Sequence, residues 1–451
     1  MKKKALTIAG SDSSAGAGIQ ADLKTFSALG IYATTAITTL TAQNTKTVSD
    51  IFVVPKKFFK NQLETTMEDV KPDVIKVGVL YDNSIIKIVK DILMDFEKPK
   101  IIDPVLYSGT GVKLLDGNSY DSFKKNILPF ADIITPNLKE AESLSNTHIE
   151  SDRDLRKVAS TILDLGAKRV VIKGGHFKKN NKYISDYYYS KNSKKAYRIT
   201  NKRLPIGETH GTGCNFSAAM ASYIAMGHKP ENAFILANTY VYHALKYATK
   251  VGDGVLVANP LYQVYNNSQK YQTLTELQKC VGYLERIDRF SSLIPETKTN
   301  FVYSVQDPTN SLEIAGVIGR MTNYGNRIRT PNVIGFGASN HIANALLIAK
   351  QFNPILRSAI NIRYSTNSIR ICEDNFICSS YDRRLESEPS KKREGSSIKW
   401  GIKYALTKNP GAQVVYHDGD YGKEPMIILL AKSPRKILKM ILTILKSRDN
   451  S

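Results

Sequence analysis

Short apolar runs alternate with amphipathic segments through the first half of this chain. Six of the runs have the length and composition of buried strands, and segments such as residues 84–96 and 155–165 repeat apolar side chains at helical spacing. Alternating strands and helices favour a mostly parallel sheet that is covered by helices on both faces. The expected strands are residues 4–10, 33–40, 74–80, 100–105, 133–137 and 169–173.

Polar residues stand at or just after the ends of these strands. In sheets of this kind, ligand sites collect beyond the carboxyl ends of the strands, because parallel strands all end at one edge. We therefore expect a single site at that edge. Its candidate residues are Asp12, Gln43, Asp103, Asn137, Lys173 and the loop 209–214.

The loop at 209–213 is small and glycine-rich, and helical spacing of apolar residues begins at Phe216. The start of a helix has unpaired N–H groups and a partial positive charge, so it can hold a phosphate or a developing oxyanion. Gly211 and Gly213 would let the backbone approach that anion closely. Cys214 lies at the helix start, where the pKa of a thiol is often lowered. The alternative is a plain loop-to-helix junction with a buried cysteine.

A second glycine-containing turn, residues 11–18, joins the first strand to a helix. It is not the phosphate loop of nucleoside triphosphatases, because the pattern G-x-x-x-x-G-K-[ST] is absent. Asp22 lies one turn into that helix, beside the apolar stripe. It is either a solvated charge or a carboxylate turned into a site.

The strand–helix pattern breaks after residue 257. Residues 263–272 are polar and indicate a linker, which divides the chain into domains at 1–262 and 263–451. Beyond the linker we expect a helix from Leu274, a helix over 342–351, and strands at 301–305, 333–337, 359–364 and 368–372. The second part is therefore a smaller α/β domain, and it shows no internal repeat of the first.

No apolar run approaches the roughly 20 residues that a membrane span needs. The apolar stretch after Lys2–Lys4 is too short for a signal peptide. The four cysteines form no C-x-x-C pair, which disfavours a zinc site. We expect a cytoplasmic protein with no membrane partner.

A formal net charge of +22 raises the question of nucleic acid. The Lys and Arg residues are spread along the chain, however, and no recognition motif is present. A protein that handles phosphorylated small molecules would have the same charge balance, so we expect no nucleic-acid partner.

Several motifs of the first domain occur in one order and resemble the hydroxymethylpyrimidine kinase/phosphomethylpyrimidine kinase family over residues 1–262. They are Ala9-Gly10-Ser11-Asp12, Gly16 to Lys24, Thr41 to Thr45, Thr135-Pro136-Asn137, Lys173 to His176 and His210 to Cys214. The resemblance implies a ribokinase-like fold. It also implies that ATP and Mg²⁺ are used to phosphorylate 4-amino-5-hydroxymethyl-2-methylpyrimidine and then its monophosphate.

The same resemblance implies roles for individual residues. Asp22 and Gln43 would bind the pyrimidine by hydrogen bonds, and Gly10 would pack under its ring. Gly211, Thr212 and Gly213 would hold the transferred phosphoryl group, and Cys214, as a thiolate, would accept the hydroxymethyl proton. The remaining implied residues are Asn137 and Glu140, which would hold Mg²⁺ through water and phosphate, and Lys173, which would reach an ATP phosphate.

Residues 273–445 resemble the archaeal-type thiamine phosphate synthase domain. The matching residues are Gly319-Arg320-Met321, Gly335 to His341, Asp382-Arg383, Glu394-Gly395 and Gly419 to Pro425. The resemblance implies condensation of the pyrimidine diphosphate with thiazole phosphate, with Arg320 and His341 as catalytic residues.

Two alternatives stay open. The second domain could be a non-catalytic sensor of thiamine phosphate, and the first could be a pyridoxal kinase of the same fold. The presence of Arg320 and His341 disfavours the sensor, and Gln43 with the Cys214 loop disfavours the pyridoxal kinase. We expect the chain to form a homo-oligomer.

Overall fold

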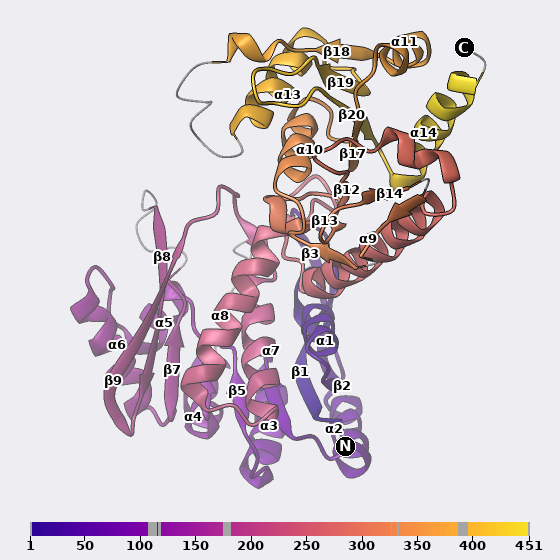
Figure 1. The fold of residues 1–451 in the computed structure, drawn as a ribbon. Coiled ribbons are helices and arrows are strands. Elements are labelled where there is room, and N and C mark those ends of the chain that lie inside the picture. Colours follow the sequence, from indigo (N-terminus) through magenta and orange to yellow (C-terminus); the bar gives the residue numbers. More distant parts are fainter. Residues whose placement is uncertain are drawn as a thin grey trace. The chain divides into compact units, whose positions relative to one another are not determined.

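The computed structural model describes residues 2–106, 115, 119–174, 182–325, 327–331, 333–386 and 396–449. The chain divides into two compact units, Met1–Val264 and Tyr265–Ser451 (Figure 1). Each unit has its own sheet and its own buried apolar clusters.

The first unit is built on a nine-stranded sheet with the order β3-β2-β1-β4-β5-β6-β7-β8-β9. The six central strands are parallel, as the sequence predicts: β2, β1, β4, β5, β6 and β7. Strands β3, β8 and β9 are antiparallel additions at the two edges. The strands are β1 (Lys4–Asp12), β2 (Tyr32–Gln43), β3 (Val48–Val53), β4 (Val74–Val77), β5 (Lys100–Ile102), β6 (Ile133–Ile134), β7 (Arg169–Ile172), β8 (Tyr183–Ser190) and β9 (Ser193–Lys202). A separate short pair consists of β10 (Thr209–His210) and β11 (Leu256–Val257).

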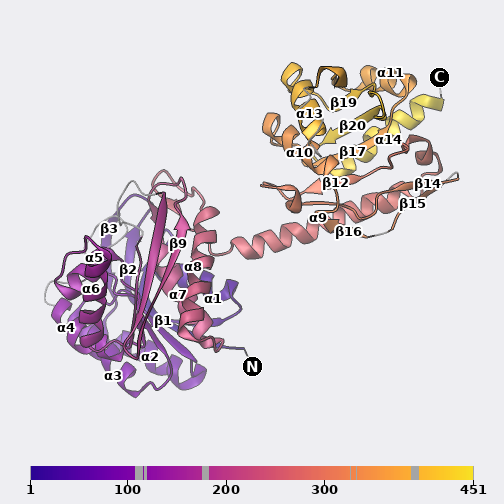
Figure 2. The ribbon, with the colours of Figure 1, turned by 60° about the vertical axis from the view of Figure 1, so that its left-hand side comes forward.

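Helices cover both faces of this sheet, so the central strands are buried on both sides and contain mostly Ile, Val, Leu and Ala. One face carries α1 (Gly18–Ala28), α7 (Thr212–Ala225) and α8 (Pro230–Lys246), as Figure 2 shows. The other face carries α2 (Lys56–Val70), α3 (Asn83–Asp95), α4 (Ser119–Asn126), α5 (Leu138–Ser145) and α6 (Asp152–Asp164), with the 3₁₀ helix η1 (Leu128–Phe130).

The segment predicted as a linker is helical. Helix α9 spans Tyr262–Leu284, so residues 263–272 continue into the helix that the sequence placed from Leu274 onward. The polar composition reflects solvent exposure: the buried residues of α9 begin only at Thr273. The division between the two units falls in the first turn of this helix.

The second unit contains a seven-stranded sheet with the order β16-β13-β12-β17-β20-β19-β18. All its neighbours are antiparallel except β18 and β19. Helices α10 and α13 pack on one face, and α9, α11 and α14 pack on the other. The strands are β12 (Phe301–Ser304), β13 (Ile314–Val317), β16 (Ile334–Phe336), β17 (Ser358–Arg363), β18 (Cys378–Ser380), β19 (Val414–His417) and β20 (Met426–Ala431), with β14 (Thr322–Tyr324) and β15 (Arg327–Arg329) as a separate pair. The helices are α10 (His341–Phe352), α11 (Thr366–Asn375), α13 (Ser396–Lys408) and α14 (Pro434–Asp449), with the 3₁₀ helices η2 (Asp288–Leu293), η3 (Ser311–Glu313) and η4 (Arg383–Leu385).

The expected strand at 368–372 is wrong, because these residues lie within α11. Ser-Ile-Arg-Ile-Cys alternates polar and apolar residues as a strand does. In the structure, Ser365 caps a helix by accepting a hydrogen bond from the N–H of Ser368, and Ile369, Ile371 and Cys372 are buried on it. Capping and packing therefore override the two-residue alternation.

Candidate active sites

The turn after β1 is organised by the carboxylate of Asp12. This carboxylate accepts hydrogen bonds from the backbone N–H groups of Ser14 (2.9 Å), Gly16 (3.0 Å) and Ala17 (2.7 Å). Burial raises the pKa of Asp12, but the hydrogen bonds from His210, Ser14 and Ala17 outweigh burial and lower it to about 2. Asp12 is therefore an ionised carboxylate that fixes the turn in front of α1.

His210 connects this turn to the end of β2. Its Nε2 lies 2.8 Å from Asp12 Oδ2 and 3.0 Å from the side-chain nitrogen of Gln43. The backbone of Gln43 is held by Ser13. The Ser13 hydroxyl donates to the backbone carbonyl of Gln43 at 2.7 Å and accepts from its backbone N–H at 2.8 Å. The sequence placed Gln43 at the site and included His210 only as part of the loop 209–214, without a role of its own.

The glycine-rich loop enters α7 as predicted. Gly211 is the N-cap and has a φ of +83°, which favours glycine. A side chain there would also collide with the carbonyl oxygen of Gly16, so the two turns pack backbone to backbone. The first N–H groups of α7 form the type of helix start that binds anions.

Cys214 does not have the lowered thiol pKa that we expected. Burial raises this pKa, the Lys76 ammonium opposes the rise only partly, and the Asp22 carboxylate adds to it, so the value is about 12. The thiol is therefore protonated near neutral pH, and the position at a helix start does not compensate for the loss of solvent around it.

Asp103, beyond β5, connects α7 with Lys173. Its carboxylate accepts hydrogen bonds from Lys173 Nζ, Thr135 Oγ1 and Ser217 Oγ, each at 3.1 Å. Burial raises the pKa of Asp103, but Lys173 and Lys76 hold it below its usual value. A Cβ added at Gly213 would lie 3.1 Å from Lys173 Nζ, so this ammonium stands directly beside the anion-binding loop.

Asp22 is not the solvated charge that one sequence interpretation allowed. It is completely buried, and it accepts hydrogen bonds from Lys76 Nζ at 2.8 Å and from Thr7 Oγ1 at 2.6 Å. Lys76 is also completely buried; burial lowers its pKa, but the Asp22 carboxylate raises it above its usual value. Burial raises the pKa of Asp22, and Lys76 opposes that rise. We infer that the pair is ionic because the two groups lie 2.8 Å apart and share no contact with solvent. Asp22 has no exposed surface, and its Oδ1 has no hydrogen-bond partner among the described residues. Gly10 is buried as well and packs against Thr39.

Asn137 and Glu140 form a reciprocal cap at the start of α5. Asn137 Oδ1 accepts from the N–H of Glu140 at 2.9 Å, and Glu140 Oε2 accepts from the N–H of Asn137 at 2.7 Å. Burial raises the pKa of Glu140 to about 7, against the opposing effect of Lys173. Among the described residues, no group of three His, Cys, Asp or Glu side chains is arranged to hold a metal ion.

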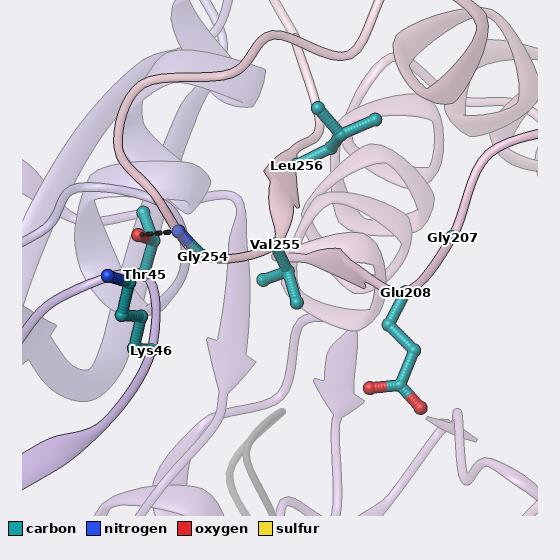
Figure 3. A pocket seen from close by; sticks show the side chains of 7 residues that line it. All are labelled: Thr45, Lys46, Gly207, Glu208, Gly254, Val255 and Leu256. Atoms are coloured by element: carbon teal, nitrogen blue, oxygen red, sulfur yellow. Dashed lines mark hydrogen bonds between the residues drawn. The ribbon is translucent and has the colours of Figure 1, made fainter.

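A pocket of about 550 Å³ lies next to the end of β2 and the loop before α7, and none of the candidate residues above lines it (Figure 3). Thr45 and Glu208 in its wall lie two positions from Gln43 and His210. The loop 252–255 closes one side, because Thr45 Oγ1 accepts from the N–H of Gly254 at 3.0 Å. The wall consists of Thr45, Lys46, Gly207, Glu208, Gly254, Val255 and Leu256.

In the second unit, Arg320 and His341 lie toward the same end of the sheet. Arg320 follows the end of β13, and His341 begins α10. Ser339, just before α10, packs over Gly316 near the end of β13. Lys350, near the end of α10, donates to the carbonyl of Gln306, which follows the end of β12. Since β12 and β13 are antiparallel, α10 starts toward the end at which β13 finishes. Both side chains are exposed.

The backbone at Arg320 is held in an unusual conformation. Its φ is +64°, which disfavours a side chain with a Cβ. Its guanidinium donates to the carbonyl of Thr297 at 2.8 Å. Glu424 accepts from the N–H groups of Glu296 (2.7 Å) and Thr297 (2.9 Å), so it anchors the segment on which Arg320 rests.

Buried polar residues that the sequence analysis did not single out stand at this same end. Asn300 is hydrogen-bonded to both backbone groups of Val317, and Asn361 Oδ1 accepts from the N–H of Asn300 at 2.8 Å. Burial, reinforced by Arg383, lowers the pKa of His417 to about 4, so this imidazole is neutral at pH 7. The only sequence signal was a polar residue next to or inside an apolar strand.

Comparison with known proteins gives a family to each unit. Residues 12–259 match the phosphomethylpyrimidine kinase family, and residues 276–443 match the thiamine-phosphate synthase ThiN family.

Among the described residues, no helix is both long and apolar enough to span a bilayer.

Individual relatives agree with this division. The bifunctional thiamine biosynthesis protein ThiDN of Methanocaldococcus jannaschii is 31% identical over 453 residues, which cover 98% of both chains. The hydroxymethylpyrimidine/phosphomethylpyrimidine kinase of Haemophilus influenzae is 38% identical over 56% of this chain and 94% of its own. A solved pyridoxal kinase from Staphylococcus aureus, in complex with AMP-PCP and pyridoxal, superposes with a TM-score of 0.53 at 36% identity, covering 58% of this chain and 95% of its own.

The nine-stranded unit thus has the fold of these pyridoxal and phosphomethylpyrimidine kinases, that is, a ribokinase-like fold. The second unit accounts for the rest of the match to the archaeal relative. From residue 12 to residue 443, this chain belongs to the family of bifunctional thiamine biosynthesis proteins, in which a phosphomethylpyrimidine kinase is joined to a ThiN-type thiamine-phosphate synthase.

Proposed function

We propose that residues 1–262 phosphorylate 4-amino-5-hydroxymethyl-2-methylpyrimidine to its monophosphate and diphosphate with ATP. Residues 263–451 then join the diphosphate to 4-methyl-5-(2-hydroxyethyl)thiazole phosphate, which gives thiamine phosphate and releases diphosphate. The observation that carries this proposal is the similarity to a bifunctional relative over 98% of both chains, because it covers both units at once.

In the kinase unit we assign the pyrimidine to Gln43, at the end of β2, and the transferred phosphoryl group to the start of α7. The N–H groups of Gly211, Thr212 and Gly213 would bind the phosphoryl oxygens, and Lys173 would neutralise an ATP phosphate beside them. Asp103 orients Lys173 through the 3.1 Å contact. Asp22 and Gly10 support the site from below rather than touching the ring.

Cys214 is assigned a hydrogen-bonding role instead of a general-base role. Its thiol is protonated at neutral pH. Phosphoryl transfer depends mainly on positioning and on charge stabilisation, so a strong base is not required. The protonated thiol would orient the hydroxymethyl oxygen toward the phosphoryl group.

Asn137 and Glu140 fit a Mg²⁺ ion that is held through water. The single side-chain oxygen of Asn137 and Oε2 of Glu140 each already accept a backbone N–H, so a hydrated ion suits these residues better than direct ligation. Mg²⁺ commonly keeps several waters and is completed by substrate phosphates. When bound, it would neutralise charge on the ATP phosphates.

In the synthase unit, Arg320 and His341 are assigned to the diphosphate leaving group and the thiazole phosphate. Negative charge grows on the leaving oxygens as the carbon–oxygen bond breaks, so a fixed guanidinium stabilises the transition state. The neutral His417 and the two buried asparagines lie at the same end of the sheet and would line the site.

The test is to incubate the full chain with the hydroxymethylpyrimidine, ATP, Mg²⁺ and thiazole phosphate, and to identify products by mass spectrometry. We expect thiamine phosphate, and we expect the pyrimidine diphosphate to accumulate when thiazole phosphate is left out. Accumulation of the diphosphate in both reactions would favour the sensor alternative for the second unit. A parallel reaction with pyridoxal tests the other alternative, and faster turnover of pyridoxal would contradict the assignment of the kinase.

A further inference from the structure

The contacts around His210 restrict how the Gln43 carboxamide can be oriented. In the structure, the side-chain nitrogen of Gln43 lies 3.0 Å from His210 Nε2, and its oxygen lies 3.2 Å from Thr41 Oγ1. The oxygen and nitrogen of a carboxamide are distinguished only by their hydrogen-bond partners. The partners therefore decide which atom faces which neighbour.

The proton on His210 Nε2 is committed to Asp12. The Asp12 carboxylate is ionised and lies 2.8 Å from Nε2, so it must receive a proton from that nitrogen. Both the neutral tautomer with Nε2–H and the imidazolium fulfil this requirement, and neither has a lone pair on Nε2. The amino group of Gln43 consequently has nothing to donate to at His210.

The reversed carboxamide satisfies every partner. Its oxygen then accepts from His210 Nε2–H, which is shared with Asp12, and its amino group donates to Thr41 Oγ1. Thr41 can accept, because its own proton is donated to the carbonyl of Ser11 at 3.0 Å. The imidazole is also fixed from the side, since a Cβ at Gly16 would collide with His210 Cδ2.

We propose that His210, oriented by Asp12, is a positioning residue that together with Thr41 fixes the Gln43 carboxamide in this one orientation. The oxygen then has one lone pair left to accept with, and the amino group has one N–H left to donate. They match a ring that carries an amino group beside an unprotonated ring nitrogen, as a 4-aminopyrimidine does. A 4-oxopyrimidine presents the opposite pattern and is rejected. This inference rests on the proposed kinase function.

The experiment measures kcat/KM of the full chain for the hydroxymethylpyrimidine and for its 4-oxo analogue, at saturating ATP. His210→Gln keeps an N–H donor near the position of Nε2, His210→Leu removes it, and His228→Leu changes an exposed histidine outside the site. A site built to hydrogen-bond its substrate discriminates by about 10⁴-fold, and we expect His210→Leu to lower the amino/oxo ratio by at least about 10-fold. The KM for ATP should not change, and His210→Gln and His228→Leu should keep the ratio within about threefold.

Thr41→Val and Thr41→Ser repeat the test from the other end of the carboxamide, with circular dichroism as the check of folding. If one pair of variants does not fold, the other pair decides. An equal loss toward both substrates, with an unchanged ratio, would overturn the proposal, because a packing role affects both alike. Wild-type protein that phosphorylates neither pyrimidine would contradict the proposed function instead, so the two failures are distinguishable.

Discussion

The two candidate sites differ in how firmly their side chains are held. In the kinase unit, short hydrogen bonds join the site residues to one another or to backbone groups, and most of these residues are buried. The residues are Asp12, His210, Gln43, Asp103 and Lys173. In the synthase unit, Arg320 and His341 are exposed, and Arg320 is held by a contact to a backbone carbonyl.

This difference reflects what each site must do. A kinase that transfers phosphoryl groups, first to an alcohol and then to a monophosphate, gains from preorganised groups whose charges are already in place. The synthase has two anionic substrates, and the exposed guanidinium of Arg320 can attract both of them before contact is made. Substitutions should therefore affect folding as well as activity in the first unit, and mainly activity in the second.

The largest effect is expected at the buried ion pair of the kinase unit. Lys76→Met leaves the Asp22 carboxylate uncompensated in the interior, which should destabilise that unit by roughly 3–5 kcal/mol. Trp400 is the single tryptophan and lies in the second unit, so its fluorescence reports that unit alone. Denaturant unfolding followed by circular dichroism should show an early transition that tryptophan fluorescence does not show.

Lys98→Met serves as the control, because it removes an exposed partner of Asp73 and should cost no more than about 1 kcal/mol. If Lys76→Met unfolded no earlier than this control, the buried pair would not be a determinant of stability.

Arg320→Ala and His341→Ala test the exposed site residues of the synthase unit. Each should lower thiamine phosphate formation by about 10²–10³-fold, since fixed donors to developing charge contribute that much. Kinase turnover should be unchanged, and Arg370→Ala, an exposed arginine on α11, should affect neither reaction. Full synthase activity in both site variants would rule out these roles, and loss of kinase activity as well would indicate misfolding.

Cys214 tests how a preorganised site uses a protonated thiol. Cys214→Ala should lower kcat by about 10-fold through loss of one hydrogen bond, and Cys214→Ser should stay within about threefold of the wild type. Because burial raises the pKa of Cys214 to about 12, the wild-type rate should not rise with thiol deprotonation between pH 7 and pH 9. A rate that grew about tenfold per pH unit, together with an inactive serine variant, would restore the general-base role.

Much of the kinase unit could be predicted from sequence, because its site residues follow regular strands at one edge of a parallel sheet. Gln43, Asp103, Lys173 and the start of α7 lie where the pattern put them. The state of Cys214 could not be predicted, because its pKa depends on desolvation by distant segments. Lys76 is the only charged residue in the apolar stretch 74–80, but its partner Asp22 is 54 positions away and cannot be identified from the sequence.

Less of the synthase unit could be predicted, because its sheet is largely antiparallel and its strands end alternately at opposite edges. Sequence order then does not show which loops meet. Asn300, Asn361 and His417 come together through strand register, which no local motif records. Residues 263–272 are helical although their composition indicates a linker, because solvent-exposed helices and disordered segments have similar compositions.

The smallest expected effect is at Glu424, which acts on Arg320 only through an intervening backbone segment. Burial raises the pKa of Glu424, but hydrogen bonds from Thr297 and Glu296 lower it below its usual value, so the group is an anion that accepts two N–H bonds. Glu424→Gln keeps the shape but loses the charge and one acceptor, which should raise the synthase KM for the pyrimidine diphosphate by about fivefold, with kcat nearly unchanged. Glu373→Gln, which alters a carboxylate bonded to Tyr416 in the same unit, is the matched control. A fall in kcat without a change in KM would mean that Glu424 takes part in the reaction itself rather than in placing Arg320.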